Sequence, residues 1–323
     1  MTPTFRLAST NEKPLITAFM DANWGSKHPL IHLEDYFDFY YKNGDKLQFA
    51  FAEADGEIVA IAGYIRANEA EKPDIWVSIW CAKKGCNGVG LELMAALPKL
   101  ANARSMSCNN IRPKTMAFYN FLCYYAARMP HFYRLSDKES YAVAQIKNKI
   151  ILPASGSSAL TKIDDKAQLK SAYKPDEALR PYKDLWYVTR RYFEYPRQKY
   201  DVWASQNGEL LVTRTVDVNG TAVLRIVDYI GNPAAFAQLG TAIDRIMKAE
   251  NAEYADCYCF GVNSEIFAEA GFCERKEDSE NIIPNYLTPP LYENTEYYFF
   301  TDAPENFTMF KADGDQDRQN VGY

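Results

Sequence analysis

The chain is poor in histidine and has no excess of positive charge. Only three of its 323 residues are histidines, and 36 Lys and Arg against 42 Asp and Glu give a formal net charge of −6. So few histidines argue against a His/Cys metal centre, and the acidic balance argues against nucleic acid as the main partner. No apolar run reaches the roughly 18 residues that span a membrane, and the first residues lack the apolar core of a signal peptide. We therefore expect a soluble cytoplasmic protein with no metal, membrane span or nucleic-acid partner.

The seven cysteines do not form a recognisable redox or zinc motif. Their number is odd, most have apolar or aromatic neighbours, and Cys257 and Cys259 are separated by one residue rather than two. We expect buried, reduced thiols.

Length and composition favour two globular domains. The chain exceeds the usual size of one hydrophobic core, and 47% apolar with 24% charged residues is ordinary globular composition. Aromatic residues reach 14%. Such a content fills cores and also suits a site that stacks on sugar rings or other flat faces.

The first half alternates strand and helix patterns. Asp55-Gly56 joins two apolar runs, which is a strong hairpin signal because both turn positions favour a positive φ. The predicted strands are 47–54, 57–65, 75–82, 105–111 and 132–135, and the predicted helices are 91–103, with Pro98 inside it, and 115–128.

The second half repeats this order. Predicted strands cover 200–204, 209–216, 222–229 and 254–260, with turns at Asn207-Gly208 and Asn219-Gly220, and predicted helices cover 233–249 and 264–270. Thirty-nine residues separate Trp80 from Tyr119, and the same number separates Asp228 from Phe267. Equal spacing of matched elements indicates two copies of one α/β domain; two unrelated α/β stretches with coincidental spacing are the alternative.

The boundary between the copies is expected where Pro, Gly and Ser gather, in Asn148–Ser158. We predict an N-terminal domain over 1–147, a linker over 148–165, a C-terminal domain over 166–303 and a polar, acidic tail over 304–323. Asp313, Asp315 and Asp317 imitate the start of a calcium loop. Arg318 occupies the sixth position, where the loop needs glycine. We therefore expect the tail to dock into the body of the protein rather than bind calcium.

A glycine-rich loop follows the apolar strand 75–82. Gly85, Gly88 and Gly90 lead directly into an apolar helix. The free N–H groups and partial positive charge of a helix N-terminus bind anions, and glycines let the backbone approach a pyrophosphate closely. A dinucleotide fold would place such a loop after the first strand, with an acidic residue about 20 residues further on. A Walker loop would continue with Gly-Lys-Ser/Thr. Neither pattern is present.

This arrangement resembles the GNAT acyltransferase superfamily. That family follows its fourth strand with a Gln/Arg-x-x-Gly-x-Gly/Ala loop and carries Tyr-x-x-x-Gly-Phe on a later helix. Gly88 and Gly90 match the loop, Gly85 stands where Gln or Arg is usual, and Lys84 is a possible replacement for that charge. Tyr119–Tyr124 matches the second motif with Cys for Gly and Tyr for Phe, and Phe267–Phe272 matches it again.

The resemblance covers most of residues 5–135 and, more loosely, 166–275. It implies an α/β (α+β) protein of two GNAT-like domains in tandem, each a mixed, mostly antiparallel sheet flanked by helices. Tandem domains also occur in Fem-type aminoacyl transferases. Further stretches are similar to GNAT-like proteins of bacterial surface-polysaccharide clusters: Trp24 to His28, Arg191-Tyr192-Phe193, Asp228 to Gly231, Ile283 to Tyr286 and Asp313 to Arg318.

The resemblance also implies a site for acetyl-CoA or another acyl-CoA as cosubstrate, without a metal. Backbone N–H groups of Cys86, Asn87, Gly88, Val89 and Gly90 would hold the pyrophosphate, and backbone groups of Trp80, Cys81 and Ala82 would polarise the thioester carbonyl. Tyr119 would protonate the departing thiolate. Packing of Tyr119 on an apolar helix face is the structural alternative.

Two stretches are candidates for the acceptor side. His28 has the pKa of a general base and lies with Trp24 in a predicted loop. Arg191 and Tyr192 belong to a basic-aromatic stretch that could bind a nucleotide-sugar diphosphate. A surface histidine and a solvated helix face are the alternatives.

These features lead to one hypothesis and two alternatives. The hypothesis is an acyl-CoA-dependent N-acyltransferase acting on a small-molecule amino sugar or sugar nucleotide for surface polysaccharide. The first alternative is a non-catalytic GNAT-like module that binds a glycan or a protein. The second is a Fem-type aminoacyl transferase, which the acidic balance disfavours because it would use charged tRNA. The sequence leaves the oligomeric state open.

Overall fold

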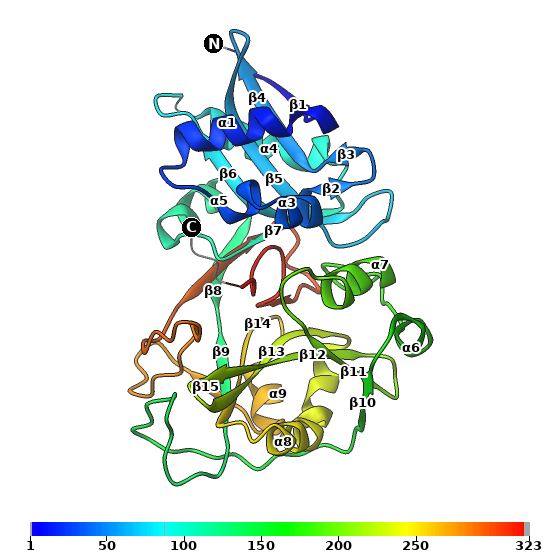
Figure 1. Cartoon of the computed structure of the whole chain (residues 1–323), viewed down its shortest axis with the longest axis vertical. Helices are drawn as coiled ribbons and strands as arrows, with labels where there is room; N and C mark the ends of the chain where they lie inside the picture. The colour runs from blue at the N-terminus through cyan, green and yellow to red at the C-terminus, as the bar shows by residue number, and fades with distance from the viewer. Residues whose placement is uncertain (1, 87, 320–323) are drawn as a thin grey trace.

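The computed structural model describes residues 2–86 and 88–319 and contains two mixed β-sheets, one in each half of the molecule (Figure 1). The first sheet has the strand order β1-β4-β5-β6-β7-β16-β8. Its strands are β1 (Thr4–Leu7), β4 (Phe49–Ala54), β5 (Glu57–Arg66), β6 (Asp74–Ala82), β7 (Ser105–Asn109), β16 (Tyr297–Thr301) and β8 (Tyr125–Met129). A separate short pair is β2 (Lys42–Asn43) with β3 (Lys46–Leu47).

The second sheet has the order β10-β11-β12-β13-β14-β9-β15, and β17 also pairs with β14. Its strands are β10 (Leu160–Ile163), β11 (Asp201–Ser205), β12 (Leu210–Val218), β13 (Thr221–Ile230), β14 (Tyr254–Phe260), β9 (His131–Leu135), β15 (Cys273–Arg275) and β17 (Met309–Phe310). Each sheet has one parallel pairing, β6 with β7 and β13 with β14, and its other pairings are antiparallel. The α+β class with two mostly antiparallel sheets is therefore confirmed.

Helices cover both faces of each sheet. In the first half, α4 (Val89–Leu100) and α5 (Met116–Phe121) pack on the alanine-rich face of β4 and β5, whereas α1 (Lys13–Asn23), α2 (Pro29–His32) and α3 (Glu34–Tyr41) pack on the opposite face. In the second half, η4 (Pro233–Leu239), α8 (Gly240–Ala249) and α9 (Ser264–Glu269) cover one face, and α6 (Lys166–Ala172), α7 (Leu185–Val188) and a turn of π-helix, η3 (Thr189–Phe193), cover the other. Short 3₁₀ turns are η1 (Thr10–Glu12) and η2 (Pro113–Thr115).

The predicted hairpins are present. Asp55 and Gly56 have φ of 52° and 82°, and Asn219 and Gly220 have φ of 53° and 87°, as such tight turns require. The predicted helix over 115–128 is wrong beyond Phe121. Cys123 adopts a φ of 61°, which ends the helix, and β8 follows with its ladder to β16.

The two sheets exchange strands. β9 comes from the first half of the chain but pairs with β14 and β15 of the second sheet. β16 comes from the end of the chain but pairs with β7 and β8 of the first sheet. Figure 1 shows both crossings between the halves. The proposed division at 148–165 remains a prediction, because the strands of the two sheets interleave across it.

The C-terminal segment, residues 309–319, lies between the two sheets, where it is red in Figure 1. Asp313, Asp315 and Asp317 are buried. Asp313 binds Lys183 at 2.6 Å and Asp317 binds Arg214 at 2.8 Å. The predicted docking of the tail into the body is confirmed for this segment, and basic residues far away in the sequence provide the counter-charges of Asp313 and Asp317.

Asp302 directly follows the exchanged strand β16, and burial destabilises the charged form of its carboxyl group. Asp302 accepts a hydrogen bond from the amide of Met106 at 2.8 Å, and burial raises its pKa to about 6. A folded protein that contains an acid with a raised pKa loses unfolding free energy as the pH rises from about 4 to about 6. The reason is that the acid ionises more readily in the unfolded chain. We expect Asp302→Asn to stabilise the protein by about 1 kcal/mol at pH 7, after discounting for solvent screening, and by nothing at about pH 4. Urea unfolding at both pH values tests this; an equal effect at both would contradict it.

Candidate functional site

The sequence-predicted site centres on a gap in the first sheet. The ladder between β6 and β7 covers only Asp74–Trp76 with Ser105–Ser107, while β6 continues to Ala82 along β5. The register on β5 passes from Val77 to Ile79, so Ser78 forms a bulge. A bulge bends its strand and increases its twist, which accounts for the divergence of β6 from β7.

The glycine loop connects β6 to α4 at the molecular surface. Gly85 and Gly88 have φ of 91° and 89°, and a Cβ at Gly85 would meet no atom within 4 Å. The first bond from the helix returns from Glu92 N to Gly88 O, and no described side chain caps the helix. The N–H groups of Val89, Gly90 and Leu91 therefore precede the first intrahelical bond. Asn87, predicted to belong to this loop, lies outside the described residues.

Two charges bear on this loop. Lys83 pairs with Glu57 at 2.7 Å, while Lys84, predicted to help hold the phosphates, is exposed. The carboxylate of Glu92 in the first turn of α4 lies 3.9 Å from the position of a Cβ on Gly88. Its negative charge opposes an anion at this end of the helix.

The predicted carbonyl-polarising residues turn alternately to the two faces of the sheet. Trp80 donates from Nε1 to the carbonyl oxygen of Gly90 at 3.0 Å, which ties β6 to α4. Cys81 contacts Asn23 O at 3.9 Å on the α1 side. Gly90 packs closely here, because a Cβ would lie 3.2 Å from both Trp80 and Ala82. Glycine at position 90 thus has a packing role as well as its predicted role at the loop.

Tyr119 on α5 is buried on the same face as α4. Its ring stacks on Phe300 of the exchanged strand at 4.1 Å and lies 6.4 Å from Trp80. Burial raises the pKa of its hydroxyl, and the neighbouring thiol of Cys108 adds to the effect. The hydroxyl therefore keeps its proton at neutral pH, but it is a weaker acid than an ordinary tyrosine, so burial makes proton donation harder. The packing of Tyr119 also fits the structural alternative.

His28 lies at the start of α2, on the opposite face of the first sheet from Tyr119. Its ring meets Trp24 edge to face at 5.5 Å, and its buried Nδ1 has no hydrogen-bond partner among the described residues. Burial, followed by the charge of Arg318, lowers its pKa to about 4. His28 is therefore neutral near pH 7 and a weaker base than its ordinary pKa implies. A joint role with Tyr119 would have to operate through the gap between β6 and β7.

The corresponding gap in the second sheet is filled by the chain itself. β13 pairs in parallel with β14 only over Leu224–Ile226, as β6 does with β7. There β17 pairs with β14 at Cys259 and Phe260, and Ala312 N donates to Val227 O at 2.9 Å. The chain itself therefore occupies the strand edges of this gap at Val227, Cys259 and Phe260.

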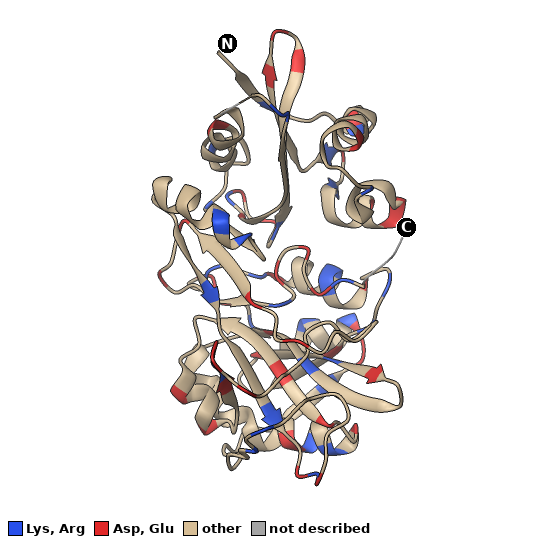
Figure 2. Cartoon of the chain, turned by 90° about the vertical axis from the view of Figure 1, so that its left-hand side faces the viewer, with Lys and Arg blue, Asp and Glu red and all other residues tan. Residues whose placement is uncertain are grey.

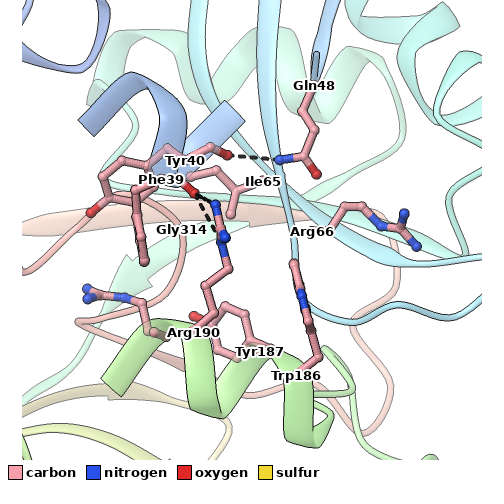
Figure 3. Close-up of a pocket in the computed structure, with 10 residues that line it drawn as sticks. Phe39, Tyr40, Gln48, Ile65, Arg66, Trp186, Tyr187, Arg190 and Gly314 are labelled. Carbon is pink, nitrogen blue, oxygen red and sulfur yellow. Dashed lines mark hydrogen bonds between the residues drawn. The ribbon is translucent and has the colours of Figure 1, made fainter. Parts of the chain in front are cut away.

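The predicted substrate residues Arg191 and Tyr192 hold the protein together instead of facing a ligand-sized space. Arg191 donates to the carbonyl oxygens of Ala312 and Gln316, and Tyr192 donates to Asp228. The cavity that Arg191 borders measures about 20 Å³, room for roughly one water molecule. Figure 3 shows this cavity and Arg190 reaching the carbonyl of Phe39 on α3. A nucleotide sugar does not fit there.

The C-terminal segment contributes to the site in a way that the sequence does not predict. Asp315 accepts from Arg318 at 2.6 Å. After burial, the charge of Asp315 is the next cause that raises the pKa of Cys108 on β7 and of Tyr41, whose hydroxyl binds Ser78 on β6. A Cβ on Gly314 would lie 3.3 Å from Trp76 on β6, and Asn110 at the end of β7 donates to Gln316 at 3.1 Å, so Asp315 between them lies beside the gap. The only sequence signal was a cluster of aspartates, which by itself indicates a solvated tail.

In residues 2–86 and 88–319, no three His, Cys, Asp or Glu side chains gather closely enough to hold a metal ion. No helix in the part of the chain that is described has the length and apolar character to cross a membrane. All seven cysteines are free thiols: three are buried and Cys123 is exposed.

Comparisons with known proteins give structural matches only. No protein-family model and no curated protein matches the sequence. A solved structure of a conserved Enterococcus faecalis protein of unknown function, described as a probable N-acyltransferase, matches over 93% of this chain and 72% of its own with a TM-score of 0.52 at 11% identity. A GCN5-related N-acetyltransferase from Anabaena variabilis covers the same shares with a TM-score of 0.50 at 10% identity. These likenesses show the fold: the chain consists of two GNAT-like α+β units in tandem, each with a mixed, mostly antiparallel sheet flanked by helices.

Proposed function

We propose that the protein is an acyl-CoA-dependent N-acyltransferase whose acceptor is an amino sugar or sugar nucleotide used for surface polysaccharide in the cytoplasm. The proposal rests above all on the contrast between the two gaps. Among the described residues, the edge of β6 beyond Trp76 has no strand partner on the β7 side and no side chain caps the N-terminus of α4, while β17 lies in the gap beside β13. The first domain would therefore hold the cosubstrate, and the second would contribute acceptor surface.

The residues divide the chemistry as follows. The N–H groups at Gly88–Gly90 bind the pyrophosphate, and the free edge of β6 at Trp80–Ala82 orients the thioester carbonyl. The amine attacks that carbonyl, the carbon–sulfur bond breaks, and Tyr119 gives its proton to the thiolate. The proton released by the amine passes to His28 or Asp315, the two candidates on the acceptor side of the gap.

Calorimetric titration of the purified chain with acetyl-CoA tests the proposal. Gly88→Glu should weaken binding beyond detection, because it places a carboxylate among the N–H groups that face the pyrophosphate. Gly56→Glu is the matched control: its φ of 82° and open surroundings resemble those of Gly88, but it lies in the hairpin between β4 and β5. Both changes carry about 1–2 kcal/mol of backbone strain. Equal acetyl-CoA affinity in the two variants would contradict the loop assignment, and no binding to the unaltered chain at millimolar concentration would refute the donor.

A non-catalytic glycan- or protein-binding module is the second candidate. The carboxylate of Glu92 beside the α4 N-terminus favours it, because a negative charge there weakens anion binding. This alternative predicts binding of an amino sugar or oligosaccharide with no affinity for CoA in the same titration. Filter binding of charged tRNA separates both from the Fem-type reading.

A further inference from the structure

A second, larger cavity lies where the two halves and the C-terminal segment meet. Its volume is about 360 Å³, and it is bordered by Pro29 next to His28 and by Asn110 at the end of β7. It therefore opens on the acceptor side of the proposed site. Acidic and basic residues are interspersed over both halves of the molecule (Figure 2), but the walls of this cavity are strongly basic. The basic residues that line it are Arg197, Arg214, Arg225, Lys311 and Arg318, with Asp317 as the acid among them.

Each arginine of the wall already has a carboxylate partner. The pairs are Arg197–Asp35 at 2.6 Å, Arg214–Asp317 at 2.8 Å, Arg225–Asp256 at 2.5 Å and Arg318–Asp315 at 2.6 Å. These pairs hold the guanidinium groups in place, and each pair as a whole carries no net charge.

Lys311 is the exception. Its Nζ binds Asn285 Oδ1 at 2.6 Å and Tyr297 OH at 3.1 Å, and among the described residues Asp317 and Asp256 act on it only through their charge, without a hydrogen bond. The residue is only 6% exposed. An ammonium group buried without a counter-ion costs several kcal/mol. Burial, followed by the charge of Arg225, lowers the pKa of Lys311 to about 7.

The rest of the wall suits an organic anion larger than an inorganic ion. Tyr286 is 44% exposed and Tyr297 lies beside Lys311, so the cavity offers aromatic faces next to its basic groups. Aromatic rings pack against sugar rings, and Lys and Arg side chains bind phosphoryl oxygens strongly. The volume accommodates a sugar with its phosphoryl group, since small-ligand sites begin at about 300 Å³.

We propose that this cavity binds the phosphoryl group of the acceptor, with Lys311 as its counter-charge and Arg214, Arg225 and Arg318 as further donors. The acceptor is then a phosphorylated amino sugar or a nucleotide-linked amino sugar rather than a free one. The assignment to an acceptor rests on the proposed function, whereas binding of a sugar phosphate in the cavity does not.

The test is calorimetric titration of the full chain with glucosamine 6-phosphate, glucosamine and inorganic pyrophosphate. We expect glucosamine 6-phosphate to bind at least about 10-fold more tightly than glucosamine, and Lys311→Met to weaken its binding by at least about 10-fold. Lys248→Met is the control, because its ammonium is 77% exposed and outside the cavity. Should Lys311→Met lower the melting temperature sharply, Arg318→Gln at the cavity mouth provides the second variant and should weaken binding as well.

The outcomes separate this inference from the proposed function. Equal binding of glucosamine 6-phosphate to the unaltered chain and to both cavity variants, or no binding at millimolar concentration, overturns the phosphoryl site even where acetyl-CoA binds. Binding of the sugar phosphate without any acetyl-CoA binding supports the cavity and refutes the transferase. Competition between glucosamine 6-phosphate and CoA for one site would assign the phosphoryl group to the α4 loop and would also overturn the inference.

Affinity should depend on pH because Lys311 must be charged to act. The groups around it are Arg225, Arg214, Asp256, Asp317, the ring of Tyr258 and the hydroxyl group of Tyr297. A bound anion favours the protonated amine, so binding takes up a proton and weakens as the pH rises above about 7. Affinity for a nucleotide sugar, whose diphosphate keeps its charge, should fall up to about 10-fold per pH unit there. The Lys311→Met variant should lose this dependence; an unchanged pH profile in the variant would contradict the role of Lys311.

Discussion

The Lys183→Met variant is expected to lose about 3–5 kcal/mol of unfolding free energy, because the change leaves buried carboxylates without their counter-charge. Lys183 Nζ lies 2.7 Å from Asp228 and 2.6 Å from Asp313, and all three side chains are buried. Burial lowers the pKa of Lys183, but the charges of the two aspartates outweigh it and raise the pKa overall. Lys183 thus links β13 to the C-terminal segment as a permanently charged group.

Lys248→Met provides the matched control for this measurement. It removes the same ammonium from an exposed pair with Asp244 on α8, where an ion pair contributes at most about 0.5 kcal/mol. Urea unfolding of both variants at pH 7 gives the comparison. The loss at position 183 should shrink at acidic pH, where the stranded carboxyl groups take up protons. A loss below about 1 kcal/mol at pH 7 would show that the C-terminal segment docks without this pair.

Tyr119→Phe is expected to lower the turnover number of acyl transfer by about 10²–10⁴-fold, the usual contribution of a positioned proton donor. The change removes one oxygen atom and keeps the ring that stacks on Phe300. Acetyl-CoA affinity and melting temperature should therefore stay close to those of the unaltered chain. The measurement is thiol release from acetyl-CoA with glucosamine 6-phosphate as the acceptor, followed for both proteins over a range of pH.

A neighbouring tyrosine, Tyr124, provides the control for this variant. Tyr124 also stacks on Phe300, with 5.4 Å between the ring centroids, and is less buried than Tyr119. Tyr124→Phe removes an equivalent hydroxyl group without touching the proposed donor. Equal turnover in the two variants would assign Tyr119 to core packing and remove it from the reaction.

Local sequence patterns were sufficient for the parts of the fold that form within short stretches. The hairpin at Asp55-Gly56 and the strand-loop-helix unit around Gly85–Gly90 depend on neighbouring residues, and both are present. The apolar residues of the stretch 122–128 fit both a helix and a strand, so the sequence pattern there also predicts a helix. Only its pairing with β16, more than 160 residues later, selects the strand.

The candidate site was predictable only on its first-domain side. The glycine loop and Tyr119 could be found from the spacing of residues. The orientation of Arg191, in contrast, depends on hydrogen bonds to the carbonyl oxygens of Ala312 and Gln316, which are distant in the sequence. The basic cavity could not be predicted from the sequence for the same reason. Arg214, Arg225 and Lys311 are scattered along the chain and become neighbours only through the docking of the C-terminal segment.

The exchange of β9 and β16 has a consequence for biosynthesis. The first sheet cannot place its strand between β7 and β8 until residues 297–301 have left the ribosome, so the half that is made first must wait for nearly the whole chain. Domains of most multidomain proteins mature one after another during translation. Here each half contributes a strand to the sheet of the other. Neither half can therefore be excised, permuted or grafted onto another protein without leaving an unpaired strand edge in a sheet.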